Sequence, residues 1–158
     1  MSLRAEIHKK LGAFSLDISL ETQGGVLGLL GASGCGKSMT LKCIAGIEKP
    51  DSGYIALDGT VLFDSKRGIN LAPQQRKVGY LFQNYALFPH MTVRQNILCG
   101  LKWEKRREIR EQKYRDILKL LQLEELQKHR PHQLSGGQAQ RTALARMLVN
   151  EPHLLLLD

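Results

Sequence analysis

The sequence lacks a long apolar run and has few cysteines. No run approaches the roughly 18 apolar residues of a membrane-spanning helix. Residues 1–10, MSLRAEIHKK, have no apolar stretch of the kind found in secretory signals. The cysteines Cys35, Cys43 and Cys99 are odd in number and have no CxxC spacing. This excludes a disulfide framework and a cysteine-based zinc site, and it favours a reducing cytoplasm.

The composition is otherwise that of a globular protein with an excess of basic residues. The 158 residues are 42% apolar and 24% charged, which suits one domain and excludes a disordered tail or a fibre. The net charge of +8 fits nucleic acid, an acidic membrane surface or a phosphate-rich ligand. Residues 102–115 hold seven basic and three acidic residues. Because these charges are interspersed, and Glu111 and Arg115 are four apart, we interpret the run as a solvated helix face.

The first half of the sequence has the patterns of strands. Residues 14–21 alternate apolar and polar side chains, as a half-buried strand does. Residues 26–30 are almost all apolar and predict a strand buried on both faces of a parallel sheet. Residues 54–57 and 61–63 flank Asp58-Gly59, a dipeptide that supplies the positive φ angles of a tight turn. They therefore predict a hairpin.

Helical patterns follow, and a strand ends the chain. Residues 38–45 predict a helix that closes at Gly46. After another apolar strand at residues 78–82, apolar residues recur at three- and four-residue steps from residue 93 to residue 147. Residues 153–158 predict a buried strand that ends in a carboxylate.

The segment GASGCGKS, residues 31–38, matches the pattern G-x-x-x-x-G-K-[ST] completely. A strand is expected before it and a helix after it. Its glycines let several backbone N–H groups point at one anion, and the helix adds its positive dipole end. Lys37 can reach phosphate oxygens, and the Ser38 hydroxyl can coordinate Mg²⁺. The segment predicts a phosphate-binding loop; a glycine turn that merely precedes Lys-Ser is the alternative.

Two further places on the chain suit the same chemistry. Asp158 follows four leucines and is either the polar end of a core strand or, beside a phosphate loop, a ligand of Mg²⁺. Residues 134–138, LSGGQ, precede an apolar helix and predict a helix N-terminus whose free N–H groups attract an anion. An ordinary N-cap at Ser135 is the alternative for that segment.

Together these motifs resemble the nucleotide-binding subunit of ATP-binding-cassette (ABC) transporters over essentially the whole chain. The resemblance implies that residues 31–38 are the Walker A motif, residues 134–138 the signature motif and residues 154–158 the Walker B motif. Gln83, at the end of the strand at residues 78–82, resembles the Q-loop glutamine.

A closer similarity is to importers of oxyanions. Residues 64–71, 76–83 and 87–93 look most like the molybdate-type ATPase. Sulfate, iron, polyamine and sugar importers share parts of this pattern. These motifs identify the superfamily more strongly than the cargo.

The resemblance implies an α/β fold. This would be a P-loop NTPase core, a mixed sheet with flanking helices, with a small antiparallel β subdomain, a helical insert and an incomplete C-terminal part. Residues 1–90 would form the ATP-binding core with the Walker A motif, the hairpin and the Q-loop. Residues 91–145 would form the helical subdomain with the signature motif, and residues 146–158 would return to the core with the Walker B strand.

ATP and Mg²⁺ are the ligands that the resemblance implies. Catalytic roles are expected for Lys37, Gln83 and Asp158, and coordination of Mg²⁺ for Ser38, Gln83 and Asp158. The nucleotide-binding residues would come from one copy at Gly31, Ser33, Gly34, Cys35, Gly36, Lys37, Ser38 and Met39, and from a second copy at Ser135, Gly136, Gly137 and Gln138. The adenine contact is open between Leu11 and Phe14. The family's catalytic glutamate, D-loop and switch histidine are expected beyond Asp158, so this chain alone is expected to be inactive in hydrolysis.

The implied function is ATP binding and hydrolysis that energises an ABC importer, through a dimer that sandwiches ATP. The cargo would be molybdate or a related oxyanion. The partners would be a second copy, a membrane-spanning permease met by residues 84–93 and, indirectly, a solute-binding protein. The protein would lie at the cytoplasmic face of the membrane, and nucleic acid is not an expected partner.

Two alternatives stay open. A soluble ABC-type ATPase acting on nucleic acid or the ribosome is favoured by the basic charge. It is disfavoured because the segment between Gln83 and Ser135 has no long heptad arm and no CxxC insertion. A regulatory or inactive nucleotide-binding module is the other alternative.

Overall fold

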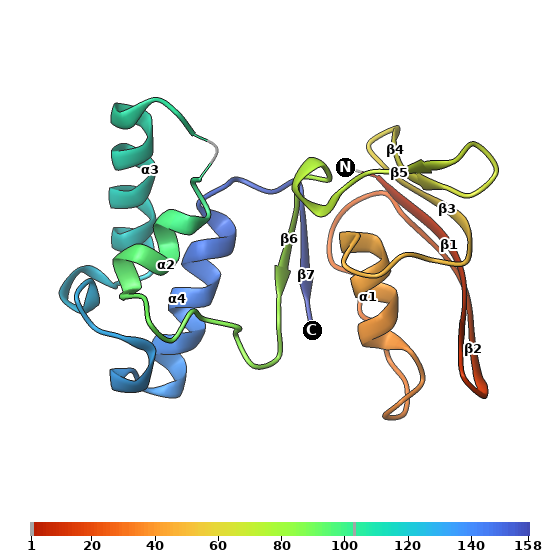
Figure 1. Ribbon diagram of the computed structural model, residues 1–158, viewed down its shortest axis with the longest axis horizontal. Helices are drawn as coiled ribbons and strands as arrows, with labels where there is room; N and C mark the ends of the chain where they lie inside the picture. Colours follow the sequence, from red (N-terminus) through yellow and green to blue (C-terminus); the bar gives the residue numbers. More distant parts are fainter. Residues whose placement is uncertain (1, 103) are drawn as a thin grey trace. The chain divides into compact units, whose positions relative to one another are not determined.

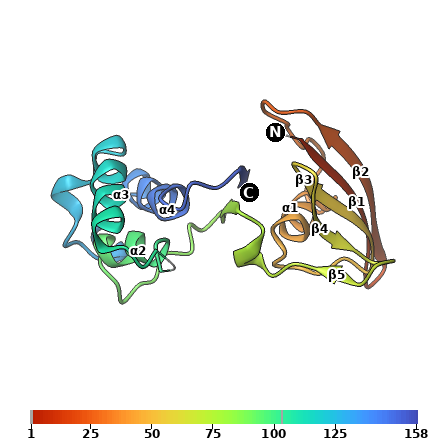
Figure 2. The ribbon, with the colours of Figure 1, turned by 90° about the horizontal axis from the view of Figure 1, so that it is seen from above.

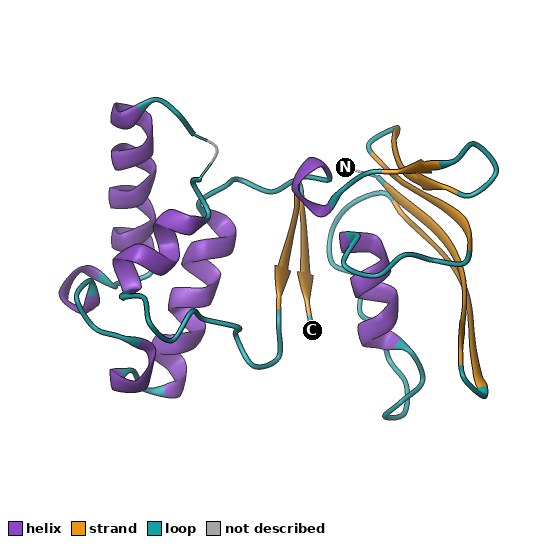
Figure 3. Ribbon diagram, viewed as in Figure 1, coloured by secondary structure: helices purple, strands orange, loops and turns teal. Residues whose placement is uncertain are grey.

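The computed structural model describes residues 2–102 and 104–158. These residues fall into two compact units: one runs up to Val78 and includes Asp158, and the other is Gly79–Leu157. Figure 1 labels the elements in chain order, and Figure 3 shows that strands dominate the first unit and helices the second. No helix in the described part of the chain is both long enough and apolar enough to cross a membrane.

The first unit is built on a five-stranded sheet with the order β2-β1-β3-β4-β5. Every neighbouring pair in it is antiparallel. The strands are β1 (Leu3–Leu11), β2 (Phe14–Thr22), β3 (Ser52–Leu57), β4 (Thr60–Asp64) and β5 (Ile69–Asn70). A short 3₁₀ turn at Pro73–Gln75 follows the sheet. The strand expected at residues 14–21 is confirmed as β2.

The β3–β4 hairpin turns at Asp58-Gly59, which confirms the prediction. The two residues have positive φ angles of 49° and 77°, and Leu57 pairs with Thr60 across the turn. A two-residue turn of this kind matches the right-handed twist of the flanking strands.

One helix covers the sheet of the first unit. Helix α1 (Lys37–Ala45) ends at Gly46, as predicted, and packs against β1. Figure 2 shows it beside the curved sheet. The alternation along β1 buries Leu3, Ala5 and Ile7, and the last three residues of α1 are buried as well. The core of this unit therefore lies between the sheet and the C-terminal half of α1.

Residues 26–30 do not form a strand, so that prediction is wrong. The segment has no regular secondary structure, and Val26 and Leu30 are 101% and 96% exposed. An apolar run becomes a buried parallel strand only where neighbouring strands supply its hydrogen bonds. The five-stranded sheet of this unit does not include the segment. Its apolar side chains face solvent instead.

The second unit contains a strand pair and three helices. The pair is β6 (Val78–Leu81) and β7 (Leu154–Leu157), which run in the same direction in Figure 1. The helices are α2 (Val93–Cys99), α3 (Arg107–Leu120) and α4 (Gly136–Leu148), with 3₁₀ turns at Glu124–Leu126 and Pro131–Gln133. The strands expected near residues 78 and 154 and the helical pattern between them are confirmed. β7 is buried only at alternate residues, because Leu155 and Leu157 are 45% and 61% exposed.

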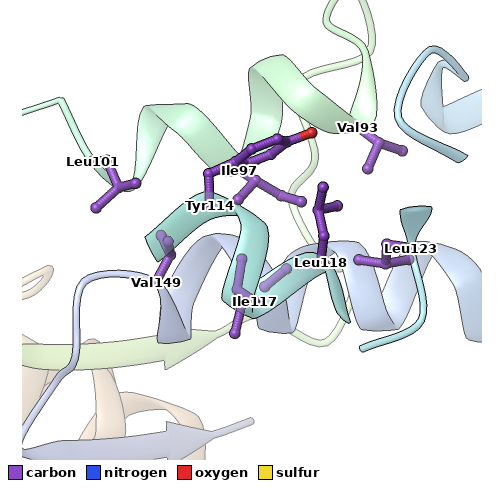
Figure 4. Close-up of a cluster of buried hydrophobic side chains, with 9 residues drawn as sticks. Val93, Ile97, Leu101, Tyr114, Ile117, Leu118, Leu123 and Val149 are labelled. Carbon is purple, nitrogen blue, oxygen red and sulfur yellow. The ribbon is translucent and has the colours of Figure 1, made fainter. Parts of the chain in front are cut away.

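The helices of the second unit share one apolar core. Figure 4 shows the side chains of this core, which come from α2, α3, α4 and the segments that join them. They are Val93, Ile97, Leu101, Tyr114, Ile117, Leu118, Leu123, Ala145 and Val149. The Tyr114 hydroxyl donates a hydrogen bond to Gln127 Oε1 at 2.8 Å, so the one polar atom in this core is satisfied.

The basic run lies largely at the surface along α3, as predicted, but its expected ion pair is wrong. Glu111 accepts a hydrogen bond from Arg94 Nη2 at 3.0 Å, and Arg115 donates to Gln112. The Arg94 guanidinium also lies over the ring of Tyr114, 4.7 Å from its centroid. Glu111 therefore pairs with an arginine of α2 that the aromatic ring already holds in place.

Candidate functional site

The loop before α1 has the conformation of an anion cradle. Gly34 and Gly36 have φ angles of 82° and 98°, in the left-handed region. The φ of Gly36 favours glycine, and a Cβ added there would lie 2.6 Å from Leu16 Cδ1 and would displace that side chain. Gly36 is the N-cap of α1 and supplies no side-chain cap. The first N–H groups of α1 are therefore available to an anion.

Lys37 curls back over this loop. Its Nζ donates to the carbonyl oxygens of Gly31 at 2.7 Å and Ala32 at 2.8 Å, and it lies 3.6 Å from Cys35 Sγ. All three contacts are to residues 31–36. The ammonium therefore lies at the mouth of the loop, where it can approach the oxygens of a phosphate bound by the backbone.

Ser38 and Asp158 provide neighbouring oxygen atoms. The Ser38 hydroxyl donates a hydrogen bond of 2.6 Å to Asp158 Oδ1, and both residues are exposed. Mg²⁺ in nucleotide sites is held by one or two protein oxygens together with water and phosphate oxygens. Across residues 2–102 and 104–158, no three His, Cys, Asp or Glu side chains gather as a metal cluster. The Ser38 hydroxyl and the Asp158 carboxylate match the one or two protein oxygens that such a Mg²⁺ site uses.

A buried arginine holds the opposite end of α1. Arg76 is 1% exposed, and its Nη1 donates to the carbonyl oxygens of Cys43 and Ile44, both at 2.9 Å. Its other donors reach Leu71 O at 2.8 Å and Asn70 Oδ1 at 2.9 Å. Burial lowers the pKa of Arg76 from its ordinary value. A cation at the C-terminal end complements the dipole of the helix whose N-terminus faces the loop.

Of the two residues considered for adenine, Phe14 lies beside the loop. Phe14 is 40% exposed, and a Cβ added to Gly36 would lie 3.5 Å from its ring. Leu11 pairs with Phe14 across the turn between β1 and β2 and is partly buried. Phe14 thus has an exposed aromatic ring next to the N-cap of α1.

Gln83 belongs to the second unit and follows β6 as an exposed residue. The chain then turns through Tyr85 and Ala86, whose φ angles of 61° and 43° are unusual for residues with side chains. Arg146 of α4 donates to the carbonyl oxygens of both turn residues, at 3.0 and 2.9 Å. The segment after Gln83 is therefore tied to α4.

Ser135 is the N-cap of α4, so the N-cap reading is confirmed. Its Oγ accepts from Gln138 N at 3.3 Å, and Gln138 Oε1 accepts from Ser135 N at 2.8 Å. This reciprocal pair leaves the N–H groups of Gly136 and Gly137 without an intrahelical acceptor, as in the first turn of any helix. Capping and anion binding therefore do not exclude each other here. Anion binding at this helix end stays a prediction.

The expected site residues thus lie in both units. The first unit brings residues 31–39 together with Asp158, and the second holds Gln83 and Ser135–Gln138. Sequence reasoning gave no role to Arg76 or Arg146. A single arginine in a sequence carries no sign that it will be buried against carbonyl oxygens.

Comparison with known proteins gives the family. The profile of the ABC transporter family matches residues 14–158. The chain is 43% identical over 156 residues to the molybdenum import ATP-binding protein ModC of Paramagnetospirillum magneticum, covering 99% of this chain and 43% of ModC. It is 48% identical over 163 residues to a probable sulfate/thiosulfate import ATP-binding protein CysA of Chlorella vulgaris, covering 100% of this chain and 66% of CysA. The chain thus spans less than half of the first relative.

A solved structure has the same fold. The structure resembles the ATP-binding cassette MJ0796, solved as a dimer in a post-hydrolysis state bound to ADP and Pi. The TM-score is 0.79 at 30% sequence identity, and the match covers 100% of this chain and 73% of that one. The α/β architecture expected from the sequence is therefore that of an ABC cassette.

Proposed function

The chain belongs to the ABC transporter family, and on that premise we propose that it binds and hydrolyses ATP to energise an importer. One observation carries the proposal: Lys37, Ser38 and Asp158 gather at the N-terminus of α1, behind a loop whose N–H groups are available. A cation, a hydroxyl and a carboxylate at a helix N-terminus are what a Mg²⁺-nucleotide requires.

Each residue of this cluster has a separate role in the proposal. The backbone of residues 34–37 and the dipole of α1 bind the phosphates, and Lys37 neutralises charge on the transferred phosphoryl group. Ser38 and Asp158 would hold Mg²⁺, which when bound would draw charge from the phosphate oxygens. Arg76 keeps α1 in place from its far end. Gln83 would respond to the terminal phosphate and would be a further ligand of Mg²⁺.

We further propose that the complete site includes a second copy of the chain. Ser135, Gln138 and the free N–H groups of Gly136 and Gly137 would contact the terminal phosphate bound by the partner copy. The exposed N-terminus of α4 supports this, since it has free N–H donors and no acidic residue in its first turn. The dimer of the related cassette MJ0796 supports it as well.

The segment after Gln83 is proposed to meet a membrane-spanning permease at the cytoplasmic face of the membrane. Phe88 is 42% exposed, and Pro89 and His90 beside it are exposed. The importers that the chain resembles support this partner, because their names describe ATP-binding proteins of import systems. Residues 91–145 would form the helical subdomain, between residues 1–90 of the core and the return at residues 146–158.

Molybdate or a related oxyanion is the proposed cargo. It is supported by the similarity to a molybdenum import protein and to a probable sulfate/thiosulfate import protein. The first name specifies molybdenum and the second specifies sulfate or thiosulfate. In this proposal the described residues would contact the nucleotide and the permease rather than the solute, so the cargo is tested in the assembled transporter.

The test is calorimetric titration of Mg·ATP into the chain, followed by phosphate release from the full-length protein. We expect saturable binding of ATP and hydrolysis that requires Mg²⁺. Lys42 lies in the last turn of the same helix, whereas Lys37 is its first residue, so Lys42→Ala is the matched control for Lys37→Ala. Absence of ATP binding in both the chain and the full-length protein would overturn the proposal.

A further inference from the structure

The turn after Gln83 is held by a single arginine. Arg146 Nη1 donates to Ala86 O at 2.9 Å, and Nη2 donates to Tyr85 O at 3.0 Å. Its guanidinium also lies over the ring of Phe88, 5.2 Å from the centroid. One planar group thus contacts three of the residues that follow Gln83. This two-pronged contact is specific to arginine, because an ammonium has no planar fork.

The turn needs this support because its backbone is strained. Tyr85 and Ala86 have φ angles of 61° and 43°, in a region that residues with a Cβ rarely occupy. Such conformations persist where the surroundings hold them, and they gather at functional sites. Among the described residues, the other backbone bonds of the turn are short-range, from Tyr85 N to Phe82 O and from Ala86 N to Asn84 O. In the part of the chain that the structure describes, Arg146 supplies the long-range hydrogen bonds to this turn.

The next part of the segment is fixed independently. Asn96 of α2 is fully buried and accepts a hydrogen bond from Phe88 N at 2.9 Å. Its Nδ2 donates to the carbonyl oxygens of Phe88, Met91 and Thr92. Residues 88–92 are therefore held by α2, whereas residues 85–86 depend on α4. Removing Arg146 frees only the part next to Gln83.

Arg146 binds backbone carbonyl oxygens and forms no ion pair among the described residues. Burial lowers its pKa, and no carboxylate among the described residues pairs with it. It lies on α4 about three helical turns after the N-cap Ser135. The same helix therefore presents the proposed phosphate contact at its start and the contact to the turn near its end.

We propose that Arg146 is a positioning residue for Gln83, holding the Tyr85–Ala86 turn so that Gln83 and helix α4 move as one piece. This rests on the proposed function, in which Gln83 and Ser135 both serve the terminal phosphate. Arg146 then couples the position of Gln83 to that of Ser135. A shift of α4 changes the direction of Gln83, and release of the turn uncouples them.

Steady-state hydrolysis by the full-length protein tests this with Arg146→Lys. We expect kcat to fall about tenfold while KM for ATP stays within about twofold, because the phosphate loop is untouched. Amide hydrogen exchange at residues 85 and 86 should become faster, while exchange at residues 97 and 98 in α2 stays as in the wild type. If kcat and exchange both match the wild type, the inference is wrong. If the wild type itself hydrolyses no ATP, the proposed function fails instead.

A suppressor separates positioning from mere stability. Glycine adopts a φ of 43° without strain, so Ala86→Gly should restore part of the kcat lost in Arg146→Lys. Leu87→Gly adds the same flexibility one residue later, where φ is not positive, and should restore nothing. Equal rescue by the two glycines, or rescue by neither, would overturn the inference. The double variant also keeps the test usable if Arg146→Lys does not fold.

Discussion

Ser38 Oγ donates a hydrogen bond of 2.6 Å to Oδ1 of Asp158, although 120 residues separate them in sequence. The bond joins the first turn of α1 to the residue that follows β7. It brings together the two oxygen donors that the sequence assigned to Mg²⁺ from separate motifs. Their proximity is the strongest single argument that the loop and the distant carboxylate serve one site.

Replacing Lys37 by alanine should weaken Mg·ATP binding. The ammonium is placed at the mouth of the loop by its contacts to Gly31 and Ala32. Loss of a charge-assisted contact worth about 1.5–3 kcal/mol corresponds to a Kd at least tenfold higher. Calorimetry measures it, with Lys42→Ala as the control. An unchanged Kd for Lys37→Ala would remove Lys37 from the site.

ATP should protect one thiol from alkylation. Cys35 is exposed within the loop, 3.6 Å from Lys37 Nζ, so a bound nucleotide would cover it. Cys99 is also exposed but lies on α2, and Cys43 is fully buried. Labelling followed by mass spectrometry should show that ATP slows reaction at Cys35 and leaves Cys99 unchanged, with Cys43 unlabelled throughout. Equal slowing at Cys35 and Cys99 would contradict the placement of the nucleotide.

Stability should decline at alkaline pH because of Cys43. Burial raises the pKa of Cys43 from 9.0 to about 11. Between these values the unfolded chain has lost the thiol proton and the folded chain keeps it, so the free energy of unfolding falls as pH rises. The full difference amounts to about 2–3 kcal/mol. Urea unfolding at pH 8 and pH 10.5 under reducing conditions should show a smaller decline in Cys43→Ala, and an identical decline would refute this cause.

A negative charge at position 135 should abolish most hydrolysis even where the N-cap of α4 is kept. Aspartate is as good an N-cap as serine, so Ser135→Asp should leave the free energy of unfolding within about 0.5 kcal/mol. Its carboxylate would repel a terminal phosphate of the partner copy and abolish most hydrolysis in the full-length protein. Ser135→Thr keeps both the cap and a neutral hydroxyl, and is the control. Hydrolysis by Ser135→Asp at the wild-type rate would exclude this contact.

Two glycines with the same backbone angle should differ in cost when replaced by alanine. Gly46 and Gly59 have φ angles of 78° and 77°. A Cβ at Gly59 meets nothing within 4 Å, whereas one at Gly46 would lie 2.5 Å from Arg76 Nε. Backbone strain should cost each variant about 1–2 kcal/mol. Urea unfolding should show that Gly46→Ala loses about 1–3 kcal/mol more of its free energy of unfolding than Gly59→Ala. Equal losses would show that Arg76 moves away from the added methyl group at no cost.

Local patterns predicted local structure well. The Asp58-Gly59 turn, the end of α1 at Gly46 and the N-cap at Ser135 each depend on a few neighbouring residues, and each is found as expected. The curled conformation of residues 31–36 was predictable for the same reason, because its glycines and Lys37 are contiguous.

Structure that depends on distant partners was not predictable. Residues 26–30 have the composition of a buried strand, but whether they pair is decided by other strands. The choice of Arg94 over Arg115 as the partner of Glu111 depends on where α2 meets α3. Arg76 and Arg146 bind backbone carbonyl oxygens, which every residue has, so no side-chain pattern marks their partners.

The hold of Lys37 on its own loop has a calorimetric and kinetic consequence. The ammonium already donates to two carbonyl oxygens, so on meeting a phosphate it exchanges partners instead of gaining them. The enthalpy of ATP binding should therefore be less favourable than the new contacts to phosphate alone would give. Entropy should then contribute a larger part of the binding free energy. Release of those carbonyl oxygens is also a unimolecular step. Where it is slow, the observed association rate reaches a plateau as the nucleotide concentration rises.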